Sequence, residues 1–176
     1  MKKILVLLML FVAAALFADV EVDFEYNAMS GFASNQFALW VENESGDVVK
    51  TIFVTDFTGA KRGYKKREQS LNNWVAAAKP AEMSDSDLDA ISGATPKSSA
   101  QHFTWDLTDS QGKKVPAGKY FIKLEATLFQ GSNVIYTGAV DLSQPALGEI
   151  AVTMKRSEPD NTKNASMIQN VKMSVK

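Results

Sequence analysis

The residues best suited to chemistry lie in the string D-A-I-S-G-A-T, which runs from Asp89 to Thr95. It holds a carboxylate on Asp89 and hydroxyl groups on Ser92 and Thr95. Gly93 and Ala94 carry no side chain beyond a methyl group, so they leave a neighbouring hydroxyl free to enter another enzyme's active site. This composition suits a segment that accepts a group onto a hydroxyl.

The string resembles the acceptor signature Asp-x-x-(Ser/Thr)-Gly-Ala-Thr of proteins that carry FMN on a threonine through a phosphoester bond. The resemblance implies that Thr95 is the acceptor, with Ser92 as the alternative. It also implies that Asp89 orients the magnesium ion of an FAD-dependent flavin transferase or helps to activate the threonine. The other interpretation is structural: Asp89, Ser92 and Gly93 only end a short helix and begin a loop.

Composition excludes several other kinds of chemistry. The 176-residue chain has no cysteine and one histidine, which excludes disulfides, thiolate metal sites, a cysteine nucleophile and multi-histidine metal sites. No spacing supports a Ser-His-Asp triad or a pair of catalytic carboxylates, so we expect no hydrolase. The net charge of −1 indicates no affinity for nucleic acid or for an anionic membrane. We expect an electron carrier or a binding protein rather than a stand-alone enzyme.

The N-terminus has the pattern of a secretory signal peptide. Lys2 and Lys3 precede an apolar stretch from 4 to 17 that is short for a membrane span, and Ala18 offers a cleavage point before Asp19. An uncleaved membrane anchor is the alternative. No cysteine follows the apolar stretch, which excludes a lipoprotein anchor. We expect a periplasmic or otherwise exported protein whose mature chain does not span the membrane.

Alternating apolar and polar residues predict β-strands along most of the mature chain, residues 19–176. The expected strands cover 20–26, 37–41, 48–55, 102–107, 119–129, 134–142, 150–154 and 167–175. Turn residues between 42 and 47 join the second and third strands in a hairpin. Short strands joined by turns predict a mainly β, immunoglobulin-like antiparallel sandwich in one domain.

A helical and loop insertion, at about 56–100, interrupts the strands. Apolar residues at helical spacing predict one helix over 70–79, and Ser84 with Asp87 in the first turn predicts a second over 84–91. The acceptor-like string then lies where the second helix passes into a loop, exposed at the surface.

Several other side chains have both a functional and a structural interpretation. Trp74 and Tyr64 are candidates to stack on a flavin ring, although a tryptophan on an apolar helix face more often belongs to the core. Trp40 and Trp105 are expected in the sandwich core. His102 could donate a proton near a flavin, but a lone histidine at the start of a strand is more often structural.

A dense basic cluster precedes the first expected helix. The cluster has three interpretations. It could attract a phosphate or an acidic partner, or pair with the acidic residues Asp85, Asp87 and Asp89, but such a run is more often a solvated loop. The cluster consists of Lys61, Arg62, Lys65, Lys66 and Arg67.

Two longer stretches resemble known families. W-D-L-T-D-S-Q-G-K-K-V-P-A-G-K-Y, residues 105–120, resembles the immunoglobulin-like module of flagellar hook-capping proteins. Residues 37–142 resemble a family of predicted periplasmic proteins, domain of unknown function 2271. The matching pieces are F-A-L-W-V-E-N, V-K-T, Trp74, D-A-I-S-G-A-T, and F-T-W-D through P-A-G-K-Y. After the loop motif that family usually has arginine, proline and glycine, whereas here Pro96 is followed by lysine and two serines.

That family tends to occur with flavin transferases and membrane redox proteins, which implies extracytosolic electron transfer. The first hypothesis is therefore an exported carrier of covalent FMN, loaded at Thr95 by a transferase and passing electrons to or from a membrane redox protein. The second is a non-catalytic immunoglobulin-like interaction module of the cell envelope, without a cofactor.

Overall fold

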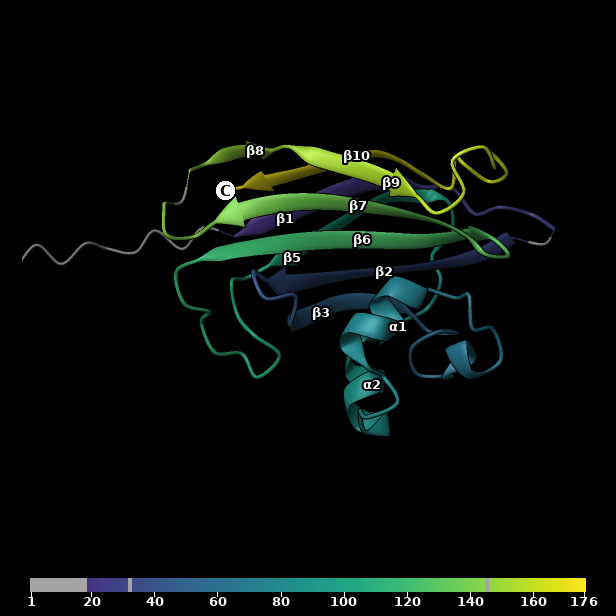
Figure 1. Cartoon of the computed structure of the whole chain (residues 1–176), viewed down its shortest axis with the longest axis horizontal. Helices are drawn as coiled ribbons and strands as arrows, with labels where there is room; N and C mark the ends of the chain where they lie inside the picture. Colours follow the sequence, from purple (N-terminus) through teal and green to yellow (C-terminus); the bar gives the residue numbers. More distant parts are fainter. Residues whose placement is uncertain (1–18, 32, 145) are drawn as a thin grey trace, which may run out of the picture.

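The structure is a computed structural model that describes residues 19–176 except residues 32 and 145. The expected signal peptide, residues 1–18, lies outside the described residues. Two β-sheets face one another, and two short helices lie against the larger sheet (Figure 1). The prediction of a mainly β sandwich with a short helical insertion is confirmed.

The smaller sheet has the strand order β5–β1–β10–β8, and all of its neighbouring strands are antiparallel. Its strands are β1 (Val20–Tyr26), β5 (Ser99–Trp105), β8 (Gly148–Ile150) and β10 (Ile168–Val175). The C-terminal strand β10 therefore lies inside this sheet, between β1 and β8, and completes the sandwich.

The larger sheet has the order β4–β3–β2–β6–β7–β9. Its strands are β2 (Ala33–Asn43), β3 (Val48–Thr55), β4 (Ser92–Gly93), β6 (Lys119–Phe129), β7 (Ser132–Asp141) and β9 (Val152–Arg156). The hairpin expected between the second and third strands is present, as β2 and β3. Only β4 runs parallel to its neighbour, β3.

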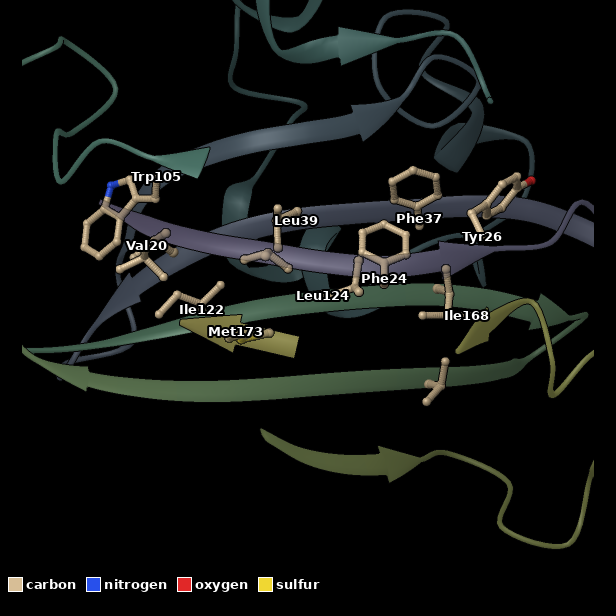
Figure 2. Close-up of a cluster of buried hydrophobic side chains, with 14 of the residues drawn as sticks. Val20, Phe24, Tyr26, Phe37, Leu39, Trp105, Ile122, Leu124, Ile168 and Met173 are labelled. Carbon is tan, nitrogen blue, oxygen red and sulfur yellow. The ribbon is translucent and has the colours of Figure 1, made fainter. Parts of the chain in front are cut away.

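The main core lies between the two sheets and follows the alternation of the sequence. In β1, Val20, Val22, Phe24 and Tyr26 are all buried, because successive side chains of a strand point to opposite faces of its sheet. Figure 2 shows Phe24 close to Phe37 of β2, and their ring centroids are 5.5 Å apart. Each large side chain buried in this way contributes about 1.5–3 kcal/mol to folding.

A second, smaller core lies on the outer face of the larger sheet. It is covered by α1 (Asn72–Ala78) and α2 (Asp85–Ile91), which follow the 3-10 turn η1 (Gly63–Lys65) (Figure 1). Trp74 of α1 and Leu88 of α2 pack in one cluster with Trp40 of β2. Strand β2 is thus buried on both faces, as its unbroken apolar run predicts.

Several element boundaries differ from the sequence prediction, among them those of β2, which covers Ala33–Asn43 rather than 37–41. Helix α1 begins at Asn72 rather than at residue 70, because Leu71 adopts a left-handed conformation with φ 50° and ψ 47°. Strand β5 begins at Ser99, three residues before the expected start. The strand expected over 150–154 is two strands, since β8 belongs to the smaller sheet and β9 to the larger.

The tryptophan-to-tyrosine run over 105–120 builds the connection between β5 and β6. The Trp105 indole Nε1 donates to the carbonyl oxygen of Thr108 at 2.9 Å, and its ring lies 5.3 Å from the ring of Tyr120. The Tyr120 hydroxyl donates to the carbonyl oxygen of Pro116 at 2.8 Å. Asp109 Oδ1 accepts two backbone N–H groups of the turn that follows it. These residue types therefore serve turn geometry and packing.

Candidate functional site

The segment that holds Thr95 crosses from the larger sheet to the smaller one. Strand β4 is the edge of the larger sheet at this side, and β5 is the edge of the smaller sheet. Residues 94–98, which we call the acceptor loop, connect them. Thr95 lies inside this loop with an exposed side chain, as predicted from the motif's position after α2.

The start of the acceptor loop is fixed by β4. Ser92 and Gly93 pair with Val54 and Thr55 of β3, and the Gly93 carbonyl oxygen accepts the backbone N–H of Asp56 at 2.7 Å. The sequence pattern predicts only a helix-to-loop exit here. A two-residue strand carries no periodicity, so only the free hydrogen-bonding edge of β3 explains it.

The hydroxyl of Ser92 is occupied by the protein itself. Ser92 is half-buried, and its Oγ accepts the backbone N–H of Ala60 at 2.9 Å. A Cβ at Gly59 would lie 2.1 Å from this same oxygen, so the loop before Ala60 packs directly on the serine. Ser92 thus fixes the start of the acceptor loop.

The end of the acceptor loop is also fixed. Ser98 Oγ accepts the backbone N–H of Ala28 at 2.9 Å, which ties the loop to the segment after β1. The Ser99 hydroxyl donates to the carbonyl oxygen of Lys97 at 3.0 Å. Within the described part of the chain, no group forms a hydrogen bond with the Thr95 hydroxyl. The loop therefore presents one free hydroxyl between two anchored ends.

Gly93 has a packing role beside the role expected for it. A Cβ at this position would lie 2.4 Å from Cε2 of Phe53, well inside contact distance. The absence of a side chain lets the Phe53 ring lie directly against β4. Ala94, the other small residue of the motif, is exposed next to Thr95.

Asp89 lies in the last turn of α2 with an exposed side chain. Its carbonyl oxygen accepts the backbone N–H of Ser92, which ends the helix. The helix begins as predicted, since Ser84 Oγ accepts the backbone N–H of Asp87 at 3.1 Å. The Asp89 backbone thus performs the structural role, while its carboxylate stays open to solvent.

The aromatic residues next to the motif are not those that the sequence suggested. Trp74 is fully buried and its Nε1 donates to Thr51 Oγ1 at 3.1 Å. It leaves no surface on which a flavin could stack, so the candidate role is wrong and the favoured core interpretation is confirmed. Tyr64 is half-buried and accepts a bond from Arg62 at 3.3 Å. Phe53 lies against Gly93 of the motif instead, and Phe103 lies next to Phe53, with ring centroids 5.2 Å apart. No local sequence pattern indicates these two residues, because β3 and β5 come together only in the folded chain.

The basic cluster is partly used within the fold. Arg62 donates to the carbonyl oxygens of Pro80 and Met83, at 2.9 and 3.0 Å, and forms an ion pair with Asp85 at 2.8 Å. Lys61 pairs with Asp56 at 2.5 Å. Among the described residues, Asp85 is the one member of the acidic segment that forms an ion pair with the cluster.

His102 lies on β5 with an exposed side chain. Its Nδ1 is 2.8 Å from Oδ1 of Asp23 on β1. The neighbouring Phe103 packs against the core between the sheets, so His102 points to the outer face of the smaller sheet. This contact supports the structural interpretation of the histidine.

A groove of ≈730 Å³ lies near α2, between the helices and β3. Its floor includes Val48 and Thr51 of β3, and its sides include Ala76 of α1 and Ile91 of α2. The lining includes both apolar and charged residues, Asp47 among the latter. The groove is the main hollow close to the acceptor motif.

The fold and the site define a β-sandwich that exposes the Thr95 hydroxyl at one edge, on a loop that is anchored at both ends. Residues 18–156 match the model of the family described as Predicted periplasmic protein (DUF2271). The chain belongs to this family. The family description gives a compartment and no activity. No curated protein and no solved structure matches the chain.

The described residues contain no helix with the length and apolar character needed to cross a membrane.

Proposed function

We propose that this periplasmic protein carries FMN covalently bound to Thr95 and takes part in extracytosolic electron transfer. The observation that carries the proposal is the exposed and unpaired Thr95 hydroxyl within a loop that is anchored at both ends. Such a loop can enter another enzyme's active site without unfolding, because the strands that hold it stay paired.

The chemistry would be a phosphoryl-group transfer. Thr95 Oγ1 would form a bond with the phosphorus of the FMN half of FAD, while the pyrophosphate bond breaks and AMP leaves. The hydroxyl proton would pass to a base in the transferase complex. Bound FMN supplies one- and two-electron transfer, and the protein supplies position and environment.

The residues around Thr95 fit these roles. Asp89 offers a solvent-facing carboxylate to the magnesium ion or to the transferase. Ser92 is a poor acceptor, because its hydroxyl accepts the Ala60 N–H and packs against Gly59. Gly93 and Ala94 add no bulk next to the hydroxyl.

The test is intact mass spectrometry of the mature protein after co-expression with a flavin transferase. We expect a gain of FMN minus water in the wild type and in Ser92→Ala, and no gain in Thr95→Ala. Ser92→Ala is the matched control because it removes the other hydroxyl of the motif.

An unmodified wild-type mass, with a known acceptor protein loaded in the same cells, would contradict the proposal. The protein would then be colourless, which is the expected property of the alternative, a non-catalytic interaction module of the envelope.

A further inference from the structure

Two half-buried phenylalanines lie at the edge of the sandwich that the acceptor loop crosses. Phe53 comes from β3 of the larger sheet and Phe103 from β5 of the smaller sheet. Their ring centroids are 5.2 Å apart. Both contact the fully packed core, where Phe37 lies 5.1 Å from Phe53 and Phe24 lies 5.9 Å from Phe103. Figure 2 shows these two core rings, Phe24 and Phe37.

The acceptor loop joins the same two edges of the sandwich. It leaves β4, whose Gly93 lies directly on the Phe53 ring, and it enters β5, which carries Phe103. The inner phenylalanines are at most 3% exposed, whereas Phe53 and Phe103 are only half-buried. Two partly exposed aromatic rings therefore lie at the edge of the sandwich that the loop crosses, one of them directly against Gly93.

We infer that the isoalloxazine ring of an FMN on Thr95 docks against Phe53 and Phe103. This inference rests on the proposed function. A planar, largely apolar ring gains free energy by covering aromatic surface in an offset or edge arrangement. The two rings belong to different sheets and are held by the core, so the surface is already formed before a flavin arrives.

The groove beside α2 is the competing location, and the strand register argues against it. Gly93 pairs with Thr55, so the chain proceeds toward Thr95 beyond the C-terminal end of β3. The groove reaches Ile91 of the motif at one side, but the β3 residues that line it are 48–51, at the other end of the strand. At about 3.3 Å per residue, these lie about 13–23 Å from Thr55 along the strand.

The test uses FMN-loaded protein and measures quenching of flavin fluorescence by iodide together with fluorescence anisotropy. The variants are Phe53→Leu and Phe103→Leu, each of which keeps an apolar side chain. Phe121→Leu is the matched control, since Phe121 is also half-buried but lies on β6, separated from β4 by β3 and β2. Ala76→Trp fills the groove.

We expect the wild-type flavin to be less accessible to iodide than free FMN and to have high anisotropy. Phe53→Leu or Phe103→Leu should raise accessibility by about two- to tenfold, the change expected from losing one aromatic contact. Phe121→Leu and Ala76→Trp should leave it unchanged.

A loaded wild-type protein whose flavin is as accessible as free FMN would overturn the inference, and this result needs no variant to fold. An effect of Ala76→Trp without an effect of the phenylalanine variants would place the ring in the groove and would also overturn it. Both outcomes leave the FMN mass gain intact, whereas the absence of that gain overturns the proposed function itself.

Discussion

Ser92 and Thr95 carry the same functional group three residues apart, and the fold gives them opposite environments. The Ser92 hydroxyl is half-buried and accepts the Ala60 N–H, while the Thr95 hydroxyl is exposed and unpaired within the described chain. The difference arises because β4 ends at Gly93. Ser92 lies within β4, next to the segment that contains Ala60, whereas Thr95 lies beyond the end of the strand. Ser92 thus anchors the loop, whereas Thr95 is the candidate acceptor.

Gly93→Ala tests whether packing against Phe53 holds the start of the acceptor loop. The new Cβ would lie 2.4 Å from the Phe53 ring, so either β4 or the ring must move. We expect the free energy of unfolding to fall by about 1–3 kcal/mol, as for other overpacked sites. Urea denaturation measures it.

Gly131→Ala is the control for this prediction, because the nearest atom to its Cβ would be Glu158 Oε1 at 3.7 Å. If both variants lose the same stability, then the contact between Gly93 and Phe53 does not hold the loop.

The scale of whole elements is illustrated by α1, whose N-terminus is capped by a strand. Leu71 at the N-cap position offers no side-chain hydrogen bond. Instead Glu125 of β6 accepts the backbone N–H of Asn73 at 3.2 Å and of Trp74 at 2.8 Å. Two of the N–H groups that a helix leaves unpaired at its start are thus satisfied by a buried carboxylate.

Glu125→Gln should destabilise the protein in a pH-dependent way. An amide has one acceptor oxygen, so one buried N–H of α1 loses its partner, at a cost of about 1–3 kcal/mol. Burial raises the pKa of Glu125 above its ordinary 4.5, although bonds from Asn73 and Trp74 lower it in part. The folded state therefore binds the proton more tightly than the unfolded state, and the carboxyl's stabilisation is greatest below pH 4.5.

It follows that the wild type's advantage over Glu125→Gln declines as pH rises through the raised pKa. Unfolding free energies measured over a pH series check this, with Glu25→Gln as the control at an exposed carboxylate of β1. An advantage that grows with pH would show that the pKa of Glu125 is lowered instead.

The segment between α1 and α2 is held by one guanidinium. Arg62→Ala removes its bonds to the carbonyl oxygens of Pro80 and Met83, whereas Asp85→Ala removes only the ion pair with a carboxylate that is 93% exposed. We expect amide hydrogen exchange over 81–91 to speed up in Arg62→Ala and to change little in Asp85→Ala. Equal effects of the two variants would assign the role to the ion pair.

Short-range sequence patterns correctly predicted the strands and helices that such patterns can specify. Alternation found β1 and β6, and the serine cap found the start of α2. The pattern Ile150, Val152, Met154 continues without a break although the chain changes sheets at Ala151, because alternation reports the face of a strand and not its sheet. Strand β4 is too short to have a pattern at all.

The site was predicted less completely for a related reason. The motif predicts Thr95, Asp89 and Ser92, and these assignments stay predictions. The folded chain brings Phe53 against Gly93 and Phe103 against Phe53, from two different sheets. Which edges of a sandwich meet depends on the pairing of distant strands. That pairing is decided by how all the core side chains pack together, so no local pattern in a single sequence shows it.

At the scale of the whole molecule, the sandwich extends past the part that matches the family. The match ends at residue 156, yet β10 lies between β1 and β8 in the smaller sheet. The C-terminal segment also contributes four buried apolar side chains to the core. These are Met167, Ile168, Met173 and Val175. The family-matching region alone therefore leaves β1 without one of its two neighbours.

A chain of residues 19–156 should consequently fail to fold. Each of the four lost side chains contributes about 1.5–3 kcal/mol, so their loss lowers the free energy of unfolding by about 6–12 kcal/mol. The total free energy of unfolding of a domain is about 5–15 kcal/mol, which is of the same size. Circular dichroism and urea denaturation of residues 19–156 against 19–176 measure this. A variant lacking only Lys176 loses its two backbone hydrogen bonds with Asp19 but no buried apolar side chain, so it should keep a cooperative unfolding transition. A cooperative unfolding transition in the shorter chain would show that β1 and β5 form a stable sheet without β10, and that the acceptor loop needs only the residues that match the family.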